Sequence, residues 1–161
     1  MLGVWHDRGI GMANLLTLTT AFPSRSLKPG EMLVEAGAPG GELYVLAKGR
    51  LSVIRDGVEI AQIEGAGALV GEMSVLLGTD YTATVTAITP VEVKVIEDGI
   101  GWLERTPIAA LHVATVACQR LDNTSALLAE LRREGSKPHE PGFFERLFGA
   151  VSGEARPASH L

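Results

Sequence analysis

The sequence has only one cysteine, Cys118, so it holds no internal disulfide framework and no cysteine-ligated iron–sulfur cluster. The cytosol is therefore the expected compartment. No apolar run reaches the length of a membrane span, and the N-terminus lacks the basic-then-apolar order of a signal peptide. Positive charge is also scarce, with 14 lysines and arginines against 19 acids and a formal net charge of −5. That balance argues against a surface that binds nucleic acid through phosphate contacts.

Catalytic and metal-binding motifs are absent as well. The sequence contains no Gly-x-Ser-x-Gly, no metal-spaced set of histidines and glutamates, and no P-loop. Glu72 and Asp80 could form a pair of carboxylates, but a turn glutamate that accepts hydrogen bonds from ligand hydroxyls is the simpler interpretation. His112 is positioned by no motif, so we expect it at a surface or an interface. We therefore expect a protein that is not an enzyme, with no catalytic residue, no metal and no cofactor.

The composition is that of one folded domain, with 161 residues, 46% of them hydrophobic and 20% charged. We expect a flexible lead-in over residues 1–12, a folded domain over residues 13–134, and a linker and tail over residues 135–161. Ala13–Phe22 is expected to form a short helix that turns Leu15, Leu16 and Leu18 towards the core, and Pro23 ends it.

Short apolar runs separated by turn residues follow from Ser26 onwards. Asp56-Gly57 lies between two such runs and predicts a β-hairpin, because both positions tolerate a positive φ. Regularly spaced strands of this kind predict an antiparallel sandwich or barrel. The expected strands are Met32–Val34, Leu43–Ala47, Leu51–Arg55, Val58–Ile63, Ala68–Val70, Ala83–Ile88 and Val91–Ile96.

The hydrophobic period becomes helical after Asp98, and Pro107 suits a first helical turn. Small and apolar residues then recur at alternating steps of three and four residues: Leu111, Ala114, Cys118, Leu121, Ser125 and Leu128. We call these six residues the seam. A heptad-like seam favours pairing of two copies, hence a homodimer, although it could also pack on its own domain. Asp122–Ser125 is a poor helix interior and predicts a break or hinge.

The tail contains an aromatic segment after a polar linker. Its apolar residues are Phe143, Phe144, Leu147 and Phe148. A short amphipathic helix of this kind could dock into a groove of a partner protein, or it could cover an apolar patch of its own domain. Val151–Leu161 is expected to be disordered.

Two segments resemble the signatures of cyclic-nucleotide-binding domains, the family of bacterial catabolite activators and kinase regulatory subunits. The first signature is filled by Leu33, Val34, Gly37, Gly40, Leu43, Tyr44, Val45, Leu46 and Gly49. The second is the phosphate-binding cassette, which is matched by Val70, Gly71, Glu72, Ser74, Val75, Thr82, Ala83 and Val85. The resemblance covers roughly residues 13–133 and implies a mainly β fold. That fold is an antiparallel, jelly-roll-like β-roll of about eight strands with flanking helices and a long C-terminal helix.

The resemblance also implies a ligand pocket, which we expect to be lined by Gly71, Glu72, Met73, Ser74, Tyr81, Thr82 and Ala83. Tyr81 occupies the position of the arginine that neutralises the phosphate in this family, and Asp80 stands where proline is frequent. No lysine, arginine or histidine occurs between Leu69 and Thr89, and nothing in the sequence brings Arg50, Arg55 or Lys94 to the cassette. We therefore expect weakened or lost binding of cAMP and cGMP.

These observations predict a regulatory or scaffold module that signals through contacts with another protein. The alternative is a sensor that binds a cyclic nucleotide or cyclic dinucleotide through Glu72 and Thr82 without the arginine. A DNA-binding regulator is not expected, because only about 27 residues follow Glu134 and they show no second pair of periodic helices.

Overall fold

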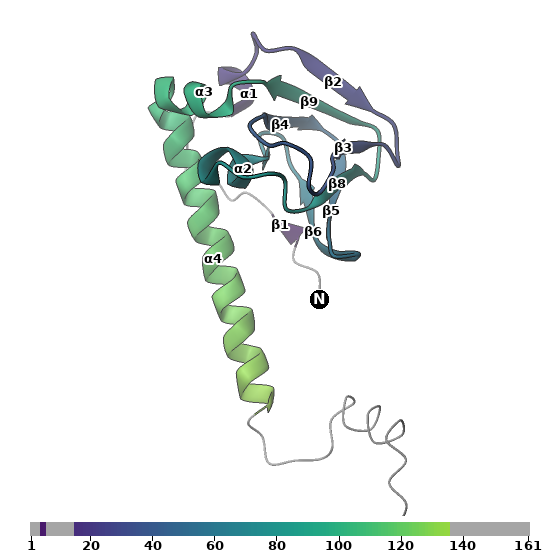
Figure 1. Cartoon of the computed structure of the whole chain (residues 1–161), viewed down its shortest axis with the longest axis vertical. Helices are drawn as coiled ribbons and strands as arrows, with labels where there is room; N and C mark the ends of the chain where they lie inside the picture. Colours follow the sequence, from purple (N-terminus) through teal and green to yellow (C-terminus); the bar gives the residue numbers. More distant parts are fainter. Residues whose placement is uncertain (1–3, 6–14, 136–161) are drawn as a thin grey trace, which may run out of the picture. The chain divides into compact units, whose positions relative to one another are not determined.

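The computed structural model describes Val4–Trp5 and residues 15–135. Within those residues the strands are β1 (Val4–Trp5), β2 (Ser24–Leu27), β3 (Met32–Val34), β4 (Leu43–Lys48), β5 (Arg50–Arg55), β6 (Val58–Glu64), β7 (Leu69–Val70), β8 (Thr84–Ala87) and β9 (Val91–Ile96). The helices are α1 (Leu15–Leu18), α2 (Glu72–Leu77), α3 (Gly99–Arg105) and α4 (Pro107–Gly135). Figure 1 labels these elements.

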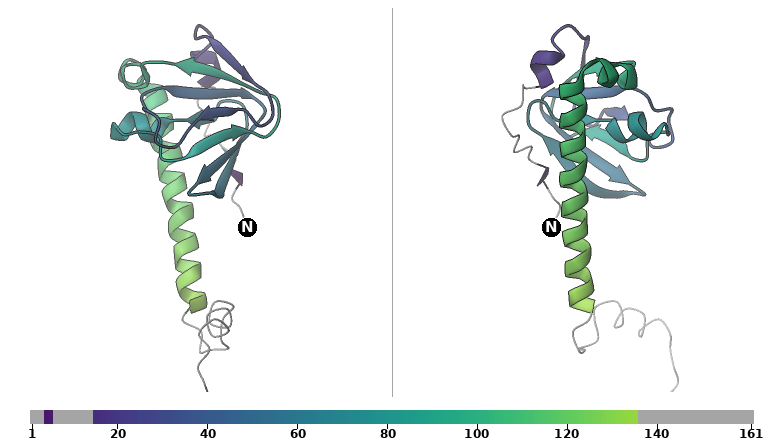
Figure 2. Two further views of the ribbon diagram at one scale, coloured as in Figure 1. Left: turned by 45° about the vertical axis from the view of Figure 1, so that its right-hand side comes forward. Right: turned by 90° about the vertical axis from the view of Figure 1, so that its left-hand side faces the viewer.

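The strands form two sheets, as the resemblance implied. One sheet has the order β1-β6-β5-β8-β3, and the other has the order β2-β9-β4-β7. All pairings are antiparallel except the pairing of β1 with β6. Figure 2 shows the sheets facing each other, so the β-roll prediction is confirmed.

Strand β4 explains why one run of the sequence is apolar without alternation. Its successive residues point to opposite faces of the sheet. Tyr44 and Leu46 enter the core between the two sheets, whereas Leu43 and Val45 enter a second core beneath the helices. All four side chains are at most 2% exposed. A strand that is buried on both faces needs apolar residues at every position.

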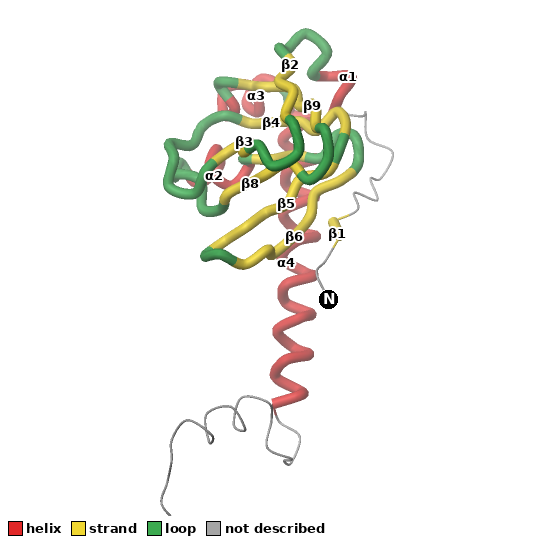
Figure 3. The backbone as a smooth tube through the Cα atoms, turned by 90° about the vertical axis from the view of Figure 1, so that its right-hand side faces the viewer, coloured by secondary structure: helices red, strands yellow, loops and turns green. Residues whose placement is uncertain are grey.

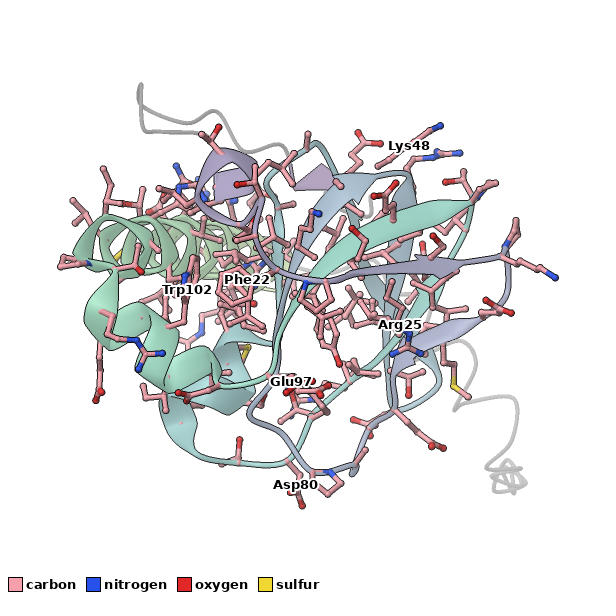
Figure 4. All side chains as sticks on the ribbon, turned by 90° about the horizontal axis from the view of Figure 1, so that it is seen from above. Phe22, Arg25, Lys48, Asp80, Glu97 and Trp102 are labelled. Atoms are coloured by element: carbon pink, nitrogen blue, oxygen red, sulfur yellow. The ribbon has the colours of Figure 1, made fainter. Side chains whose placement is uncertain are left out.

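The second core attaches the helices to the roll. Leu15 of α1, Val75 of α2, and Trp102 and Leu103 of α3 pack on the outer face of the four-stranded sheet, together with Val113 of α4. Phe22 meets Trp102 edge to face with ring centroids 6.0 Å apart, and Figure 4 shows the pair side by side. This packing fixes α2 and α3 on one side of the roll.

Several local predictions need correction. The expected helix over Ala13–Phe22 is reduced to α1 in the described residues, because the Thr19 hydroxyl donates to the Leu15 carbonyl at 2.9 Å and the chain turns there. Strand β2 was not predicted, since only Leu27 of its four residues is buried and no apolar period shows. Within the expected lead-in, Val4–Trp5 forms β1 along the edge of β6, and both residue types favour strands.

The expected break in the C-terminal helix is wrong. Helix α4 continues through Asp122–Ser125, and the Thr124 hydroxyl donates to the Arg120 carbonyl at 2.9 Å, which satisfies the side chain within the helix. By its internal contacts the chain divides into Met1–Gln119 and Arg120–Leu161, so α4 begins in the first unit and ends in the second. None of the helices in the described part of the chain is long and apolar enough to cross a membrane.

Candidate functional site

The cassette lies between β7 and β8, and Figure 3 shows α2 and the loop that follows it. Gly71 connects β7 to α2 with φ +94°, a left-handed conformation that side chains disfavour. A Cβ atom at this position would stand 2.5 Å from the Glu42 carbonyl oxygen. The glycine therefore allows the start of α2 to pack directly on the chain segment that leads into β4.

The short helix α2 divides the cassette residues between two sides. Glu72, Ser74 and Val75 are buried, and the Ser74 hydroxyl donates to the Gly71 carbonyl at 2.9 Å. Met73 is 49% exposed and lies on the solvent side. The structure thus places Glu72 and Ser74 against the roll and turns Met73 away from it.

Tyr81, at the arginine position of the cassette, is built into the core. Its side chain is 8% exposed and belongs to the cluster between the sheets. Its hydroxyl donates to the Glu42 carbonyl at 3.1 Å. Its backbone is held as well, since its N–H donates to the Ala38 carbonyl at 3.0 Å and its carbonyl accepts from the Gly37 N–H at 2.8 Å. The phenol is therefore a structural member of the site with a satisfied hydroxyl.

Glu42 stands at the centre of this arrangement. The Tyr44 hydroxyl donates to its carboxylate, while the Tyr81 hydroxyl donates to its backbone carbonyl. Burial raises the pKa of both tyrosines, and the negative charge of Glu42 raises them further. Both phenols therefore remain neutral donors at physiological pH. We refer to Glu42, Tyr44 and Tyr81 as the tyrosine–glutamate cluster.

The remaining predicted pocket residues lie on the loop that leads into β8. Thr82 is exposed and Ala83 is half-buried. The next residue, Thr84, fixes the loop to the opposite chain segment, because its hydroxyl accepts a hydrogen bond from the Ala36 N–H at 3.1 Å. The structure therefore brings Gly71 and Tyr81 against the Glu42 carbonyl and links Ser74 to Gly71, while the Thr82 side chain stays on the surface.

Of the three basic residues considered as cations for the cassette, Lys94 and Arg50 lie elsewhere on the roll. The Lys94 ammonium lies 2.9 Å from Ser24 Oγ and 3.4 Å from the Phe22 carbonyl oxygen. Arg50 lies opposite Glu64 in the backbone ladder of β5 and β6, at the other end of β5. Arg55 differs, because the β5–β8 ladder ends with Ile54 opposite Thr84, and Arg55 is the residue that follows Ile54. Arg55 is thus the one of these three cations whose backbone the ladder places next to the cassette.

Glu42 was not predicted as a site residue. It belongs to no signature position, and the sequence separates it from Tyr81 by 39 residues. The only signal was its place just before the apolar run of β4, which also contains Tyr44. The hydrogen bond between Tyr81 and Glu42 joins two segments that are distant in the sequence, so it could be identified only once the register of the sheets was known.

The residues predicted to make protein contacts lie on α4 or beyond it. In the first unit, Leu111 is 59% exposed, and Ala114 and Cys118 are also exposed. In the second unit, Leu121 is 68% and Leu128 56% exposed. Phe143, Phe144, Leu147 and Phe148 lie outside the described residues. The prediction for His112 is wrong, because this side chain is 8% exposed, on the same buried face of α4 as Ala109 and Val113.

Residues 24–99 match the family model described as the cyclic nucleotide-binding domain. Among solved structures, the catabolite activator protein of Thermus thermophilus is similar, with a TM-score of 0.64 and 27% identity over 76% of this chain and 61% of that chain. The fold and the family resemblance are thereby confirmed.

Two curated relatives have different overall organisations. A CRP-like cAMP-activated global transcriptional regulator of Mycobacterium tuberculosis is 27% identical over 77% of this chain and 58% of its own length. The cGMP-dependent protein kinase egl-4 of Caenorhabditis briggsae is 29% identical over 53% of this chain and 11% of its own length. This chain thus spans only part of each relative. Because one of them is a transcriptional regulator, the expected absence of DNA binding stays a prediction.

Proposed function

Since residues 24–99 belong to the cyclic nucleotide-binding domain family, we propose that this chain is a cytosolic, non-enzymatic regulatory or scaffold module whose binding of cAMP and cGMP is weakened or lost. The observation that carries this proposal is the place of Tyr81. Its buried phenol, at the cassette position where the family resemblance puts an arginine, donates to the Glu42 carbonyl at 3.1 Å.

The charges of the site support the same conclusion. A cyclic monophosphate carries one negative charge, and a guanidinium can pair with it through two charge-assisted hydrogen bonds. Such bonds contribute about 2–3 kcal/mol, or roughly two orders of magnitude in affinity. Here the cluster contributes two neutral phenols and the half-buried carboxylate of Glu42 instead, and Asp80 adds an exposed acid. The local field therefore opposes an anionic ligand.

Calorimetric titration of the wild-type chain with cAMP, cGMP and cyclic di-GMP tests the proposal. We expect no binding heat at ligand concentrations up to about 1 mM, which corresponds to a binding free energy weaker than about −4 kcal/mol. Saturable binding in the micromolar range would refute it. A mock titration with the corresponding linear monophosphates controls for non-specific phosphate binding.

One observation favours a second candidate function. Arg55 follows Ile54, which lies opposite Thr84 at the end of the β5–β8 ladder, and it is exposed, so its long side chain could supply a cation to a ligand held by Glu72 and Thr82. The chain would then be a sensor of a cyclic nucleotide or cyclic dinucleotide. If the wild type binds, loss of binding in Arg55→Ala but not in Arg50→Ala identifies this mode.

The proposed output is contact with another protein or a second copy of the chain. Seam residues Leu111, Cys118, Leu121 and Leu128 are exposed, and apolar residues at heptad spacing are the pattern that pairs two helices. The aromatic segment Phe143–Phe148 is proposed as an additional contact on the partner.

A matched pair of leucines tests the seam. Leu128 lies on the seam and Leu127 lies off it, and each is 56% exposed. In sedimentation equilibrium we expect Leu128→Glu to shift a homodimer towards monomers and to raise its dissociation constant at least about tenfold. Leu127→Glu should leave the dimer intact. Equal effects of the two variants would contradict a defined seam.

The same measurement on a chain that ends at Glu134 tests the tail, and an unchanged association constant would show that the aromatic segment takes no part in dimerisation.

A further inference from the structure

Helix α2 carries an unusual distribution of side chains for a surface helix. Its polar residues Glu72 and Ser74 are buried, with exposures of 5% and 4%. Its solvent side instead presents Met73, Leu76 and Leu77, which are 49%, 52% and 66% exposed. These positions follow the i, i+3, i+4 spacing of a single helical face. The six residues of α2 thus expose no charged side chain and form an apolar ridge.

The first turn of α3 extends this ridge. The Gly99 N–H donates to the Gly41 carbonyl at 3.1 Å, and a Cβ atom at Gly99 would stand 2.7 Å from Cγ2 of Val75. This close approach brings the following residue, Ile100, to the side of α2, and Ile100 is 47% exposed. Figure 2 shows the two helices on one side of the roll. We call Met73, Leu76, Leu77 and Ile100 the α2–α3 surface.

Acidic residues flank the segments of the α2–α3 surface along the chain. Asp80 follows α2 by three residues, Glu97 and Asp98 lead into α3, and Glu104 lies one turn after Ile100 on the same face of α3. All four are exposed. Arg105 is the cation of this segment, and it lies 3.6 Å from Asp98. In Figure 4 the labelled Asp80 and Glu97 lie well away from the labelled Lys48.

Single exposed apolar residues are ordinary on protein surfaces, but three on one face of a short helix, with a fourth on the helix packed beside it and acidic residues close by in the chain, indicate a binding surface. Its shape and charge identify the kind of partner. A ridge at i, i+3, i+4 packs into the grooves of another helix, and flanking acidic residues attract basic residues beside that helix's apolar face. The tail of this chain does not have that charge, because residues 136–161 contain three basic residues, Lys137, Arg146 and Arg156, and three glutamates, Glu140, Glu145 and Glu154.

We propose that the α2–α3 surface binds an amphipathic helix of a partner protein whose apolar face is bordered by lysine or arginine. This partner contact is distinct from the seam of α4, and it does not depend on whether the cassette binds a nucleotide. It adds a partner class to the proposed regulatory role. Because α2 is itself the cassette helix, such a partner would occupy the outer side of the same element whose inner side carries Glu72.

The chain contains its own probe for this surface and its own control. Met73 lies on the α2–α3 surface at 49% exposure, and Met32 lies on β3 at 50% exposure. We would label the methionine methyl groups of the full chain with ¹³C and titrate it with a synthetic leucine–lysine amphipathic peptide. The expected result is a saturable shift of the Met73 methyl resonance with no shift of the Met32 resonance. A leucine–glutamate peptide of the same pattern is expected to leave both unchanged.

Paired variants make the test specific. The double variant Leu76→Ser, Leu77→Ser should lower the affinity for the leucine–lysine peptide at least about tenfold, because two apolar contacts are lost. Val58→Ser with Ile60→Ser removes two residues that are 61% and 48% exposed on β6 and should leave the affinity unchanged. Binding should also weaken as salt is raised, because the flanking acidic residues are screened.

Three results would overturn the proposal. The first is equal peptide binding by the Leu76→Ser, Leu77→Ser variant when thermal melting shows that it is folded. The second is a Met73 resonance that shifts when residues 136–161 are deleted without peptide, which would make the chain's own tail the occupant. The third is self-association that the same leucine substitutions abolish, which would make the occupant a second copy. None of these depends on nucleotide titration, so failure of this inference and failure of the proposed function are distinguishable.

Discussion

The double variant Tyr81→Arg, Glu42→Gln is expected to bind cAMP about 100-fold more tightly than the wild type, and Tyr81→Arg alone is expected to gain no more than about tenfold. A guanidinium at position 81 would provide two charge-assisted donors for a cyclic phosphate. In the single variant, however, the Glu42 carboxylate remains beside it. Calorimetric titration measures the affinities of the variants that bind, and the limit of about 1 mM expected for the wild type makes each gain a lower bound.

The geometry of the tyrosine–glutamate cluster is the reason for this difference. The Tyr81 hydroxyl bonds to the Glu42 backbone, and the Tyr44 hydroxyl bonds to the Glu42 carboxylate. An arginine that reaches the same place would pair with that carboxylate and be neutralised before any ligand arrives. Glutamine keeps the size and an acceptor for Tyr44 while it removes the charge.

Two controls keep this experiment interpretable. Glu42→Gln alone should bind no nucleotide, and Tyr81→Phe should remove only the hydroxyl from a side chain that is 8% exposed. Each variant is compared by thermal melting, because position 81 belongs to the core between the sheets. A folded double variant without any gain, or an equal gain in Tyr81→Arg alone, would contradict the role assigned to Glu42.

Gly71→Ala is expected to destabilise the protein by about 3 kcal/mol or more, which lowers the melting temperature by roughly 10 °C. Two costs combine at this position. A residue with a Cβ atom is strained at φ +94°, and that atom would stand 2.5 Å from the Glu42 carbonyl oxygen. This carbonyl also accepts the Tyr81 hydroxyl, so its displacement would disturb the cluster.

Gly65 is the matched control, because its φ is +98° and no atom lies within 4 Å of the position of its Cβ. Gly65→Ala should therefore show the backbone strain alone, about 1–2 kcal/mol. Chemical denaturation of both variants separates the two costs. Similar losses of unfolding free energy in the two variants would mean that the segment around Glu42 shifts at little cost to make room for the Cβ atom. Gly71 would then be required only for its positive φ.

The sequence was sufficient for those parts of the fold in which neighbouring residues set the pattern. Asp56-Gly57 predicted the hairpin between β5 and β6, and both residues adopt a positive φ. The strands β3 and β9 have the predicted bounds, because apolar runs between glycine or proline turns are a local signal. The cassette was indicated by the resemblance to cyclic-nucleotide-binding domains, and α2 begins at Glu72.

Features that depend on tertiary contacts were missed. Strand β2 is polar and owes its conformation to pairing with β9, from Ser24 opposite Lys94 to Leu27 opposite Val91. His112 was expected at a surface or an interface but is buried, since a single histidine in a helix carries no sign of the face that becomes buried. Glu42 has no motif, and its importance arises because two tyrosines from different segments converge on it.

The tyrosine–glutamate cluster also bears on the evolutionary history that is open to this chain. A cassette that had lost only its arginine could regain it by one substitution, and selection could act on that single step. Here Tyr81→Arg alone is expected to meet the Glu42 carboxylate, and Glu42→Gln alone adds no cation. Neither single substitution is expected to bring more than about a tenfold gain in affinity, so recovery of full nucleotide binding requires both changes. Under the proposed function, the Glu42 carboxylate thus makes the loss of nucleotide affinity hard to reverse by a single substitution.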